Sequence, residues 1–326
     1  MPEVRIDPLS GDKVIVAAER AARPGGGPRA EPAPRLDPAH DPFAEGAEDR
    51  TPPELYAVRP QGGQADGPGW TARVVPNLYP ALSPDAAQPP ADAYPDLFAA
   101  RAAAGAHEVI VNAPESVGSL AELRPERVTG ALEVWRERMR IHHDAAYVHV
   151  IVNERVEAGS SLPHTHAQLY ALDFVPAPVA RERESFAAHA LRTMGRNLLE
   201  DLVQEEVRRR ERVVAIDDEA VLLAPFAGRV PYQLMLVPRQ PRLRFEDEGP
   251  TGAALLHDGL RRLGRRLGAN PPLNLWVRTA PRGAEHFCWH IDVLPRVTHL
   301  AGLELGAGVH LNIVSPEQAA AELRDA

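Results

Sequence analysis

The stretch at residues 147–172, YVHVIVNERVEAGSSLPHTHAQLYAL, contains two apolar segments joined by a Gly-Ser turn. Each segment has the length and the residue types of a β-strand, so the stretch predicts two neighbouring strands. In the second segment His164, His166 and Gln168 stand at alternate positions. Side chains at alternate positions of a strand project from the same face. The pattern therefore predicts two imidazoles and an amide side by side on one face.

The order of elements around this stretch occurs twice. The first series is HEVIVNAP (107–114), a helix from about residue 125, YVHVIVNE (147–154) and LPHTHAQLYAL (162–172). The second is YQLMLVP (232–238), a helix over 251–268, LNLWVRTAP (273–281) and EHFCWHIDVLP (285–295). A chance match of common elements explains the same order less well. We expect an α+β fold of two duplicated halves, 1–180 and 181–326, each a mainly antiparallel sheet with a packed helix.

The remaining segments complete the predicted fold. Residues 4–17 read as strand, turn and strand, residues 70–77 as a strand, and residues 212–238 as three short strands. A single helix is expected over residues 181–210, and a short one over 317–325. Residues 24–68 are dense in Pro, Gly, Ala and Asp, with few large apolar side chains, and predict a long loop.

Composition excludes several classes of protein. The formal net charge of −9 argues against nucleic acid as a partner. Cys288 is the only cysteine, which rules out an internal disulfide and any multi-cysteine zinc site. No apolar run reaches the roughly 18 residues that span a bilayer, and the N-terminus is too charged for a signal peptide. We therefore expect a cytoplasmic protein without a membrane partner.

His166 is the sharpest candidate for chemistry. A neutral imidazole can attack an activated phosphorus and form a covalent intermediate, provided that a neighbour on its other nitrogen fixes the tautomer. A polar strand face that only meets water or another strand explains the spacing equally well. A zinc half-site is a further interpretation, but no cluster of additional His, Cys or carboxylate ligands stands out.

Other polar residues allow two interpretations each. Arg20 and Arg23 follow the second predicted strand and could grip phosphate oxygens, or could be solvated surface side chains. Asn77 and Asn153 end predicted strands, where their amides could hold a nucleotide or simply cap a turn.

Longer segments resemble the galactose-1-phosphate uridylyltransferase family, in the nucleotidyl-transferring branch of the histidine triad superfamily. The resemblance covers nearly the whole chain and is carried by RIDPLSGDKVIVAAERAARP (5–24), VVPNLYPAL (74–82), VNERVEAGSSLPHTHAQLYA (152–171), HFCWHIDVLPR (286–296) and AGLELGAGVHLNIVSPEQAAAELR (301–324). It implies two histidine-triad-like halves and a ping-pong reaction through uridylyl-His166. UDP-glucose would give up its uridylyl group to His166, and galactose 1-phosphate would then accept it.

The same resemblance implies roles for individual residues. Gln168 and Ser161 would hydrogen-bond the transferring phosphoryl group, and Arg20, Arg23, Asn77 and Asn153 would bind substrate. The family's zinc site commonly uses a Cys-Pro-Phe-Cys run, a further histidine and the first histidine of the signature. Here DPFA (41–44) and Ser116 stand at those positions, and only His164 remains. We therefore expect zinc to be bound weakly or not at all.

A second metal site of some family members is also altered. Glu182 and His290 match its positions, but Arg278 and Asp292 stand where histidines are expected. These departures leave the substrate open. The alternatives are an adenylyl transferase similar to ADP-glucose phosphorylases, and a degenerate nucleotide-binding protein without turnover. A nucleotide sugar and a sugar 1-phosphate are the expected ligands, and a homodimer is the expected assembly.

Overall fold

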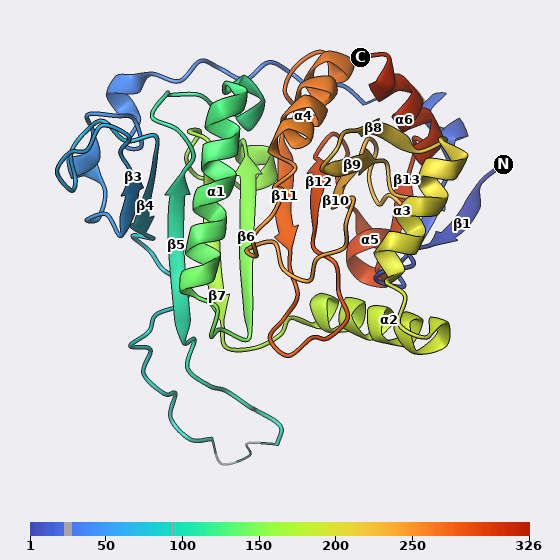
Figure 1. Ribbon diagram of the computed structural model, residues 1–326, viewed down its shortest axis with the longest axis horizontal. Coiled ribbons are helices and arrows are strands. Elements are labelled where there is room, and N and C mark those ends of the chain that lie inside the picture. The colour runs from blue at the N-terminus through green and yellow to red at the C-terminus, as the bar shows by residue number, and fades with distance from the viewer. Residues whose placement is uncertain (23–27, 93, 95) are drawn as a thin grey trace.

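A large antiparallel sheet forms the centre of the fold (Figure 1). The computed structural model describes residues 1–22, 28–92, 94 and 96–326. Ten strands of this part of the chain pair in the order β3-β4-β5-β7-β6-β11-β12-β10-β9-β8. A smaller sheet has the order β1-β2-β13. The helices that the structure describes are too short or too polar to span a membrane.

The strands have the following bounds. Those of the large sheet are β3 (Tyr56–Val58), β4 (Ala72–Pro76), β5 (Gly105–Val111), β6 (Tyr147–Glu154), β7 (His166–Leu172), β8 (Val213–Ile216), β9 (Ala220–Leu223), β10 (Leu234–Pro238), β11 (Leu273–Arg278) and β12 (His290–Pro295). Those of the small sheet are β1 (Glu3–Ile6), β2 (Lys13–Val16) and β13 (Val309–Asn312).

The α-helices are α1 (Pro125–Ile141), α2 (Ala177–Thr193), α3 (Leu198–Arg209), α4 (Ala253–Leu267), α5 (Gly302–Ala307) and α6 (Pro316–Arg324). Single 3₁₀ turns are η1 (Ala18–Ala22), η2 (Pro38–His40), η3 (Glu48–Arg50), η4 (Leu120–Glu122) and η5 (Val156–Ala158). Pro125 begins α1, as predicted, because a proline at the first helical position loses no hydrogen bond there.

Strand order repeats in the two halves, which confirms the predicted fold class. The first half runs β5, α1, β6, β7 along the chain and places β7 between β5 and β6. The second runs β10, α4, β11, β12 and places β12 between β10 and β11. The halves meet where β6 pairs antiparallel with β11. The boundary at residue 180 stays a prediction, and the structure adds that β2 pairs with β13 from the far end of the chain.

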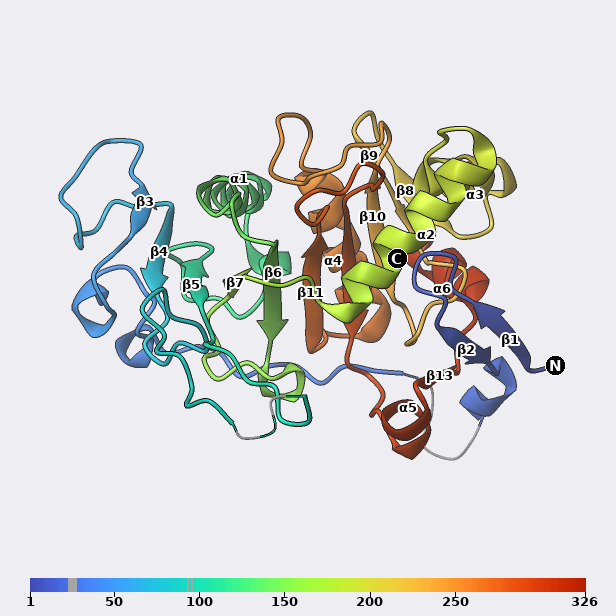
Figure 2. The same ribbon diagram turned by 90° about the horizontal axis from the view of Figure 1, so that it is seen from below.

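The two faces of the large sheet are covered differently. Alternate side chains of the central strands, such as Ile110, Leu169 and Ile291, join one buried apolar cluster with residues of α1 and α4. The opposite face of the second half is covered by α2, α3 and the turn between β1 and β2, through residues such as Phe186, Leu199 and Leu9. In Figure 2, α1 lies on one side of the sheet and the segment that starts at residue 28 crosses on the other.

The prediction of one helix over residues 181–210 was wrong, because the chain forms α2 and α3 instead. Met194 and Gly195 both have a positive φ, 56° and 102°, and this left-handed backbone ends α2. The Asn197 side chain then accepts from the backbone N–H groups of Leu199 and Glu200 and begins α3. The amphipathic pattern continued across the break, so periodicity alone did not reveal it.

The predicted loop over residues 24–68 is partly ordered. It contains η2, η3 and the short strand β3, which pairs with β4 at the edge of the large sheet. Residues 28–45 run along the molecule from the side of the small sheet to the side of β3 (Figure 2). On the way, Ala30 N–H donates to the Leu267 carbonyl and Glu45 N–H to the Pro114 carbonyl. Backbone partners far along the sequence therefore fix this segment.

Candidate active site

A cavity of about 470 Å³ lies against β7, on the face opposite to α1 and α4. His166 and Gln168 line it from β7, Phe43 and Arg50 from the segment before β3, and Asn77 from the end of β4. Ala167 and Leu169, the intervening residues of β7, point into the core instead. Strand β7 therefore places polar and apolar side chains on opposite faces, as the sequence predicted. The size of the cavity suits a small organic ligand.

The His166 imidazole has one nitrogen occupied. Its Nδ1 lies 2.7 Å from the His164 carbonyl oxygen, which can only accept, so Nδ1 carries the hydrogen. Nε2 is left with its lone pair. Burial lowers the pKa of His166, because the charged form loses solvation. The ring is thus neutral, and Nε2 has the lone pair that a nucleophile needs. The Phe43 ring packs edge-on against it, with 5.3 Å between the ring centroids.

The Gln168 side chain is fixed by hydrogen bonds to neighbouring side chains. Its Oε1 lies 3.0 Å from Nε2 of His107 on β5 and accepts from the Tyr170 hydroxyl at 2.9 Å. Asn77 is bound in turn, since its Oδ1 accepts from the Tyr79 N–H at 2.9 Å. Two amides therefore line the cavity in orientations fixed by the protein.

His164 does not line the cavity, so the predicted row of three side chains is split. Its Nδ1 lies 2.7 Å from Asp41 Oδ2, and its Nε2 lies 2.9 Å from the Ala113 carbonyl oxygen. Burial alone would raise the pKa of Asp41, but the hydrogen bond and charge of His164, together with the hydrogen bonds from Ser116 and the Phe43 N–H, outweigh burial and lower it. Asp41, His164 and Ala113 thus form a buried polar network that anchors the backbone carbonyl used by His166.

The residues at the family's zinc positions do not fit a zinc ion. A ligating imidazole needs one nitrogen with a free lone pair, yet both nitrogens of His164 face oxygens that can only accept. Ala44 has no donor atom for a metal. Throughout the described part of the chain, no group of three or more His, Cys, Asp or Glu side chains is placed to hold a metal. A structural zinc site needs about four such ligands.

The second metal position holds a cation of the protein itself. Arg278 Nε lies 3.0 Å from Glu182 Oε2, and both side chains are buried. The contact lacks hydrogen-bond alignment and acts as an ion pair. Burial disfavours the charge of Arg278, but Glu182, Tyr147 and Asp292 together outweigh burial and raise the pKa of the guanidinium. The guanidinium supplies the positive charge that a metal would supply there.

The other predicted residues are distributed unevenly. Ser161 and Asn77 line the cavity with His166 and Gln168. Asn153 lies on the same sheet face of β6, where its Oδ1 accepts from Asn274 at 2.8 Å, but it does not line the cavity. Arg20 is exposed on η1 and does not line it either. Arg23 lies outside the described residues. Substrate contacts of all these residues stay predictions.

Several site residues escaped sequence analysis. Phe43 and Arg50 lie in the segment predicted as a loop, and nothing in the Pro-, Gly- and Ala-rich composition of that segment marked them as site residues. In the sequence, His107 is a single histidine outside any motif. The β5–β7 register pairs His107 with Tyr170 and Val109 with Gln168. Knowledge of that register would have found His107 and Tyr170 beside the motif.

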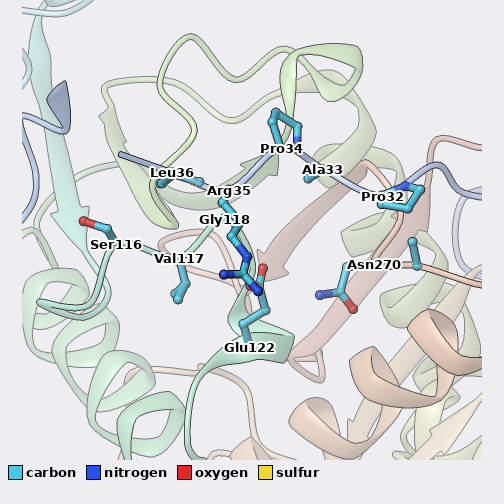
Figure 3. Close-up of a pocket in the computed structure, with 11 residues that line it drawn as sticks. Pro32, Ala33, Pro34, Arg35, Leu36, Ser116, Val117, Gly118, Glu122 and Asn270 are labelled. Atoms are coloured by element: carbon cyan, nitrogen blue, oxygen red, sulfur yellow. The ribbon is translucent and has the colours of Figure 1, made fainter. Parts of the chain in front are cut away.

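A second cavity of about 410 Å³ lies elsewhere, between residues 32–36, residues 116–118 and Asn270. In Figure 3, Arg35 reaches from the first segment toward Glu122. None of its lining residues was predicted as catalytic or substrate-binding. The cavity beside β7 combines an imidazole that has a free lone pair with hydrogen-bond donors, and it is therefore the candidate active site.

Known proteins resemble the chain over its whole length. Residues 1–176 match the family described as galactose-1-phosphate uridyl transferase, N-terminal domain, and residues 99–325 match a domain of unknown function. An ADP-glucose phosphorylase of Arabidopsis thaliana is 28% identical over 99% of this chain and 93% of its own. A galactose-1-phosphate uridylyltransferase of Cryptococcus neoformans is 27% identical over 98% of this chain and 89% of its own.

A solved structure shows the same arrangement. The crystal structure of an ADP-glucose phosphorylase from Arabidopsis thaliana with bound ADP-glucose superposes with a TM-score of 0.82. It is 26% identical and covers 100% of this chain and 99% of its own.

Proposed function

The chain belongs to the galactose-1-phosphate uridyl transferase family, a family of nucleotidyl-transferring enzymes, and on that premise we propose that it transfers a nucleotidyl group through a covalent bond to His166. The observation that carries the proposal is the tautomer of the neutral His166 imidazole. Nδ1 is held by the His164 carbonyl at 2.7 Å, and the neutral Nε2 belongs to a side chain that lines the cavity.

The reaction has two half-reactions. In the first, His166 Nε2 forms a bond to the α-phosphorus of UDP-glucose, and the bond from that phosphorus to the bridging oxygen breaks. Glucose 1-phosphate leaves with the electron pair. In the second, a phosphate oxygen of galactose 1-phosphate attacks the same phosphorus, the P–N bond breaks, and UDP-galactose is released. Each step exchanges one bond at phosphorus.

The surrounding groups support this chemistry. When Nε2 is bonded to phosphorus the ring becomes positive, and the His164 carbonyl stabilises that charge through Nδ1–H. The amide of Gln168 and the hydroxyl of Ser161 are donors suited to the phosphoryl oxygens. Phe43, Val75 and Val109 give the cavity an apolar wall suited to a nucleobase or sugar.

A second candidate is an ADP-glucose phosphorylase. Similarity favours it, since a relative of that name and a structure with bound ADP-glucose match nearly the whole chain. In that reaction His166 takes the adenylyl group from ADP-glucose and glucose 1-phosphate leaves. Inorganic phosphate then attacks the same phosphorus, the P–N bond breaks, and ADP is released. Nucleophile and donors act as before, and only the base and the acceptor differ.

The test is to mix the protein separately with UDP-glucose and with ADP-glucose, without acceptor, and to quench in base, where a phosphoramidate survives. Intact-mass spectrometry should show one nucleotidyl group added by the true donor, on the peptide containing LPHTHAQLYAL. A chase with galactose 1-phosphate or phosphate should then remove it. Binding of both nucleotide sugars without an adduct would contradict the proposal and identify a non-catalytic nucleotide-binding protein.

A further inference from the structure

Gln168 is supported by a network that joins β7 to β5 and to the segment after β4. The Ala81 backbone N–H donates to Nδ1 of His107 at 3.1 Å. Nε2 of the same ring lies 3.0 Å from Gln168 Oε1. The Tyr170 hydroxyl reaches that oxygen too, at 2.9 Å. His107 is only 8% exposed, so water does not compete freely for these bonds.

The direction of each bond in this network follows from its first member. A backbone N–H can only donate, so His107 Nδ1 must accept and the ring hydrogen must lie on Nε2. The Nε2–H group must then donate, and Gln168 must meet it with its oxygen. Burial lowers the pKa of His107, which keeps the ring neutral in this tautomer.

This polarity decides which end of the Gln168 amide a ligand meets. With Oε1 accepting from both His107 and Tyr170, the NH₂ group is the end left for the cavity that Gln168 lines. An amide free to rotate by 180° would also present its oxygen. That oxygen would repel a negatively charged phosphoryl group, whereas the NH₂ group donates to it.

Asn77 follows the same rule. Its Oδ1 accepts from the Tyr79 N–H, so its NH₂ group faces the other way. The Asn77 Nδ2 lies 3.1 Å from His107 Nε2, but both atoms are donors in this tautomer, so the contact is not a hydrogen bond. The amide hydrogens of Asn77 are thus also available to a ligand.

The ring of His107 is fixed by packing as well as by hydrogen bonds. It stacks on Tyr170 with 4.1 Å between ring centroids and 24° between planes. The two residues are paired across β5 and β7, which places them directly opposite each other. Because the ring is held in place, the hydrogen bond from the Ala81 N–H to Nδ1 keeps Nε2–H directed at Gln168 Oε1.

We propose that His107, assisted by Tyr170, is a positioning residue that holds Gln168 with its NH₂ group toward the transferred phosphoryl group. The inference rests on the proposed function, because it assigns a role within that reaction. His107 itself does not touch the reacting atoms; it acts through Gln168.

A double-mutant cycle tests the proposal. His107→Phe keeps an aromatic ring against Tyr170 but removes both nitrogens, and Gln168→Ala removes the amide. The rate of His166 nucleotidylation at saturating nucleotide sugar should fall about tenfold in His107→Phe, and about a hundredfold or more in Gln168→Ala. The double variant should react at the rate of Gln168→Ala alone, because His107 acts through that side chain.

Two further variants separate positioning from a structural role. His107→Gln, whose amide can still donate to Gln168, should recover part of the rate. His143→Phe, at an exposed histidine away from the cavity, is the matched control and should react like the parent. Should His107→Phe fail to fold, Tyr170→Phe removes only the hydroxyl and is expected to slow the reaction severalfold, again only when Gln168 is present.

The outcomes distinguish the two proposals. A parent protein that forms no adduct from either nucleotide sugar overturns the proposed function. A parent that forms the adduct, with folded His107→Phe reacting at the parental rate, overturns the positioning role alone. Independent, multiplicative losses in the double variant would do the same, since they would show that His107 acts by another route.

Discussion

His166 on β7 and His290 on β12 occupy equivalent places in the two halves of the molecule, yet only His166 lines a cavity large enough for a substrate. Both rings place Nδ1 near the backbone carbonyl two residues earlier, at 2.7 Å from His164 and at 3.2 Å from Cys288. Both also stand on the same face of the large sheet, because Ala167 and Ile291 point into the shared core. The repeated strand order therefore produces the same local geometry twice.

The difference lies in what covers that face. Beside His166 there is a cavity of about 470 Å³. Beside His290 the cavity is about 30 Å³, and its walls carry Glu182 from α2, Arg278 and Asp292. The His290 Nε2 lies 3.7 Å from Asp292 Oδ2. A histidine with one fixed nitrogen becomes a candidate nucleophile only where the other nitrogen meets a ligand rather than the protein.

Replacing each histidine in turn gives the largest expected contrast. His166→Ala should abolish the covalent adduct, because no second imidazole stands among the described side chains that line the cavity. His290→Ala should form the adduct at a rate within about threefold of the parent, since it belongs to the closed half. Quenched-flow mass spectrometry measures both. Comparable losses in the two variants would show that the halves are functionally coupled and break the comparison.

The ion pair that closes the second half should matter for stability. Arg278→Leu leaves the Glu182 carboxylate buried without its cation, which typically costs about 3–5 kcal/mol of unfolding free energy. The double variant Arg278→Leu with Glu182→Leu should lose less, because no unpaired charge remains. Urea denaturation monitored by tryptophan fluorescence measures the difference. Equal losses in single and double variants would mean that packing, not the charge pair, dominates here.

The first half buries a carboxyl group, that of Glu154, without such a cation. Glu154 accepts from the Leu120 N–H at 2.7 Å, and burial raises its pKa to about 7. The folded state therefore keeps a proton that the unfolded chain releases near pH 4.5, so this stability is present below that pH and is lost as the pH rises through about 7. The loss corresponds to about 3 kcal/mol at roughly 1.4 kcal/mol per pH unit.

Glu154→Gln should remove this pH dependence. The Gln side chain still accepts from Leu120 but never ionises, so the variant should exceed the parent in stability above neutral pH. Urea denaturation at pH 5 and pH 8 measures it. Glu182→Gln is the comparison from the second half and should lose stability at both values, because it unpairs Arg278. Parallel pH profiles for Glu154→Gln and the parent would contradict the assignment.

Metal removal should have the smallest effect. We expect prolonged treatment with a chelator to change neither thermal unfolding nor adduct formation. In one half Asp41 is hydrogen-bonded to the His164 ring, and in the other Arg278 stands at the position of the metal cation. Elemental analysis of untagged protein before treatment is the control. About one tightly bound zinc per chain, or a drop in unfolding temperature on chelation, would show that one of these pairs rearranges to bind metal.

Sequence patterns alone identified most elements of the fold. Period-two alternation predicted β6 and β7, a proline followed by helical spacing predicted α1, and the recurring order predicted the duplicated halves. The pattern failed between α2 and α3, where a left-handed turn at Met194 interrupts a continuous amphipathic repeat. Periodicity reports which face is buried, and it does not report where the backbone changes direction.

The sequence by itself also determined which chemical groups the strand can provide, because a His-x-His-x-Gln strand presents its imidazoles and its amide at alternate positions. The tertiary structure decided which of them meet the cavity. Asp41 lies 123 residues before His164, and His107 lies 61 residues before Gln168, yet both contacts fix the state of the site. Such partners are set by strand register and chain crossing, which depend on the packing of the whole sheet. The same packing opened the face beside His166 and closed it beside His290.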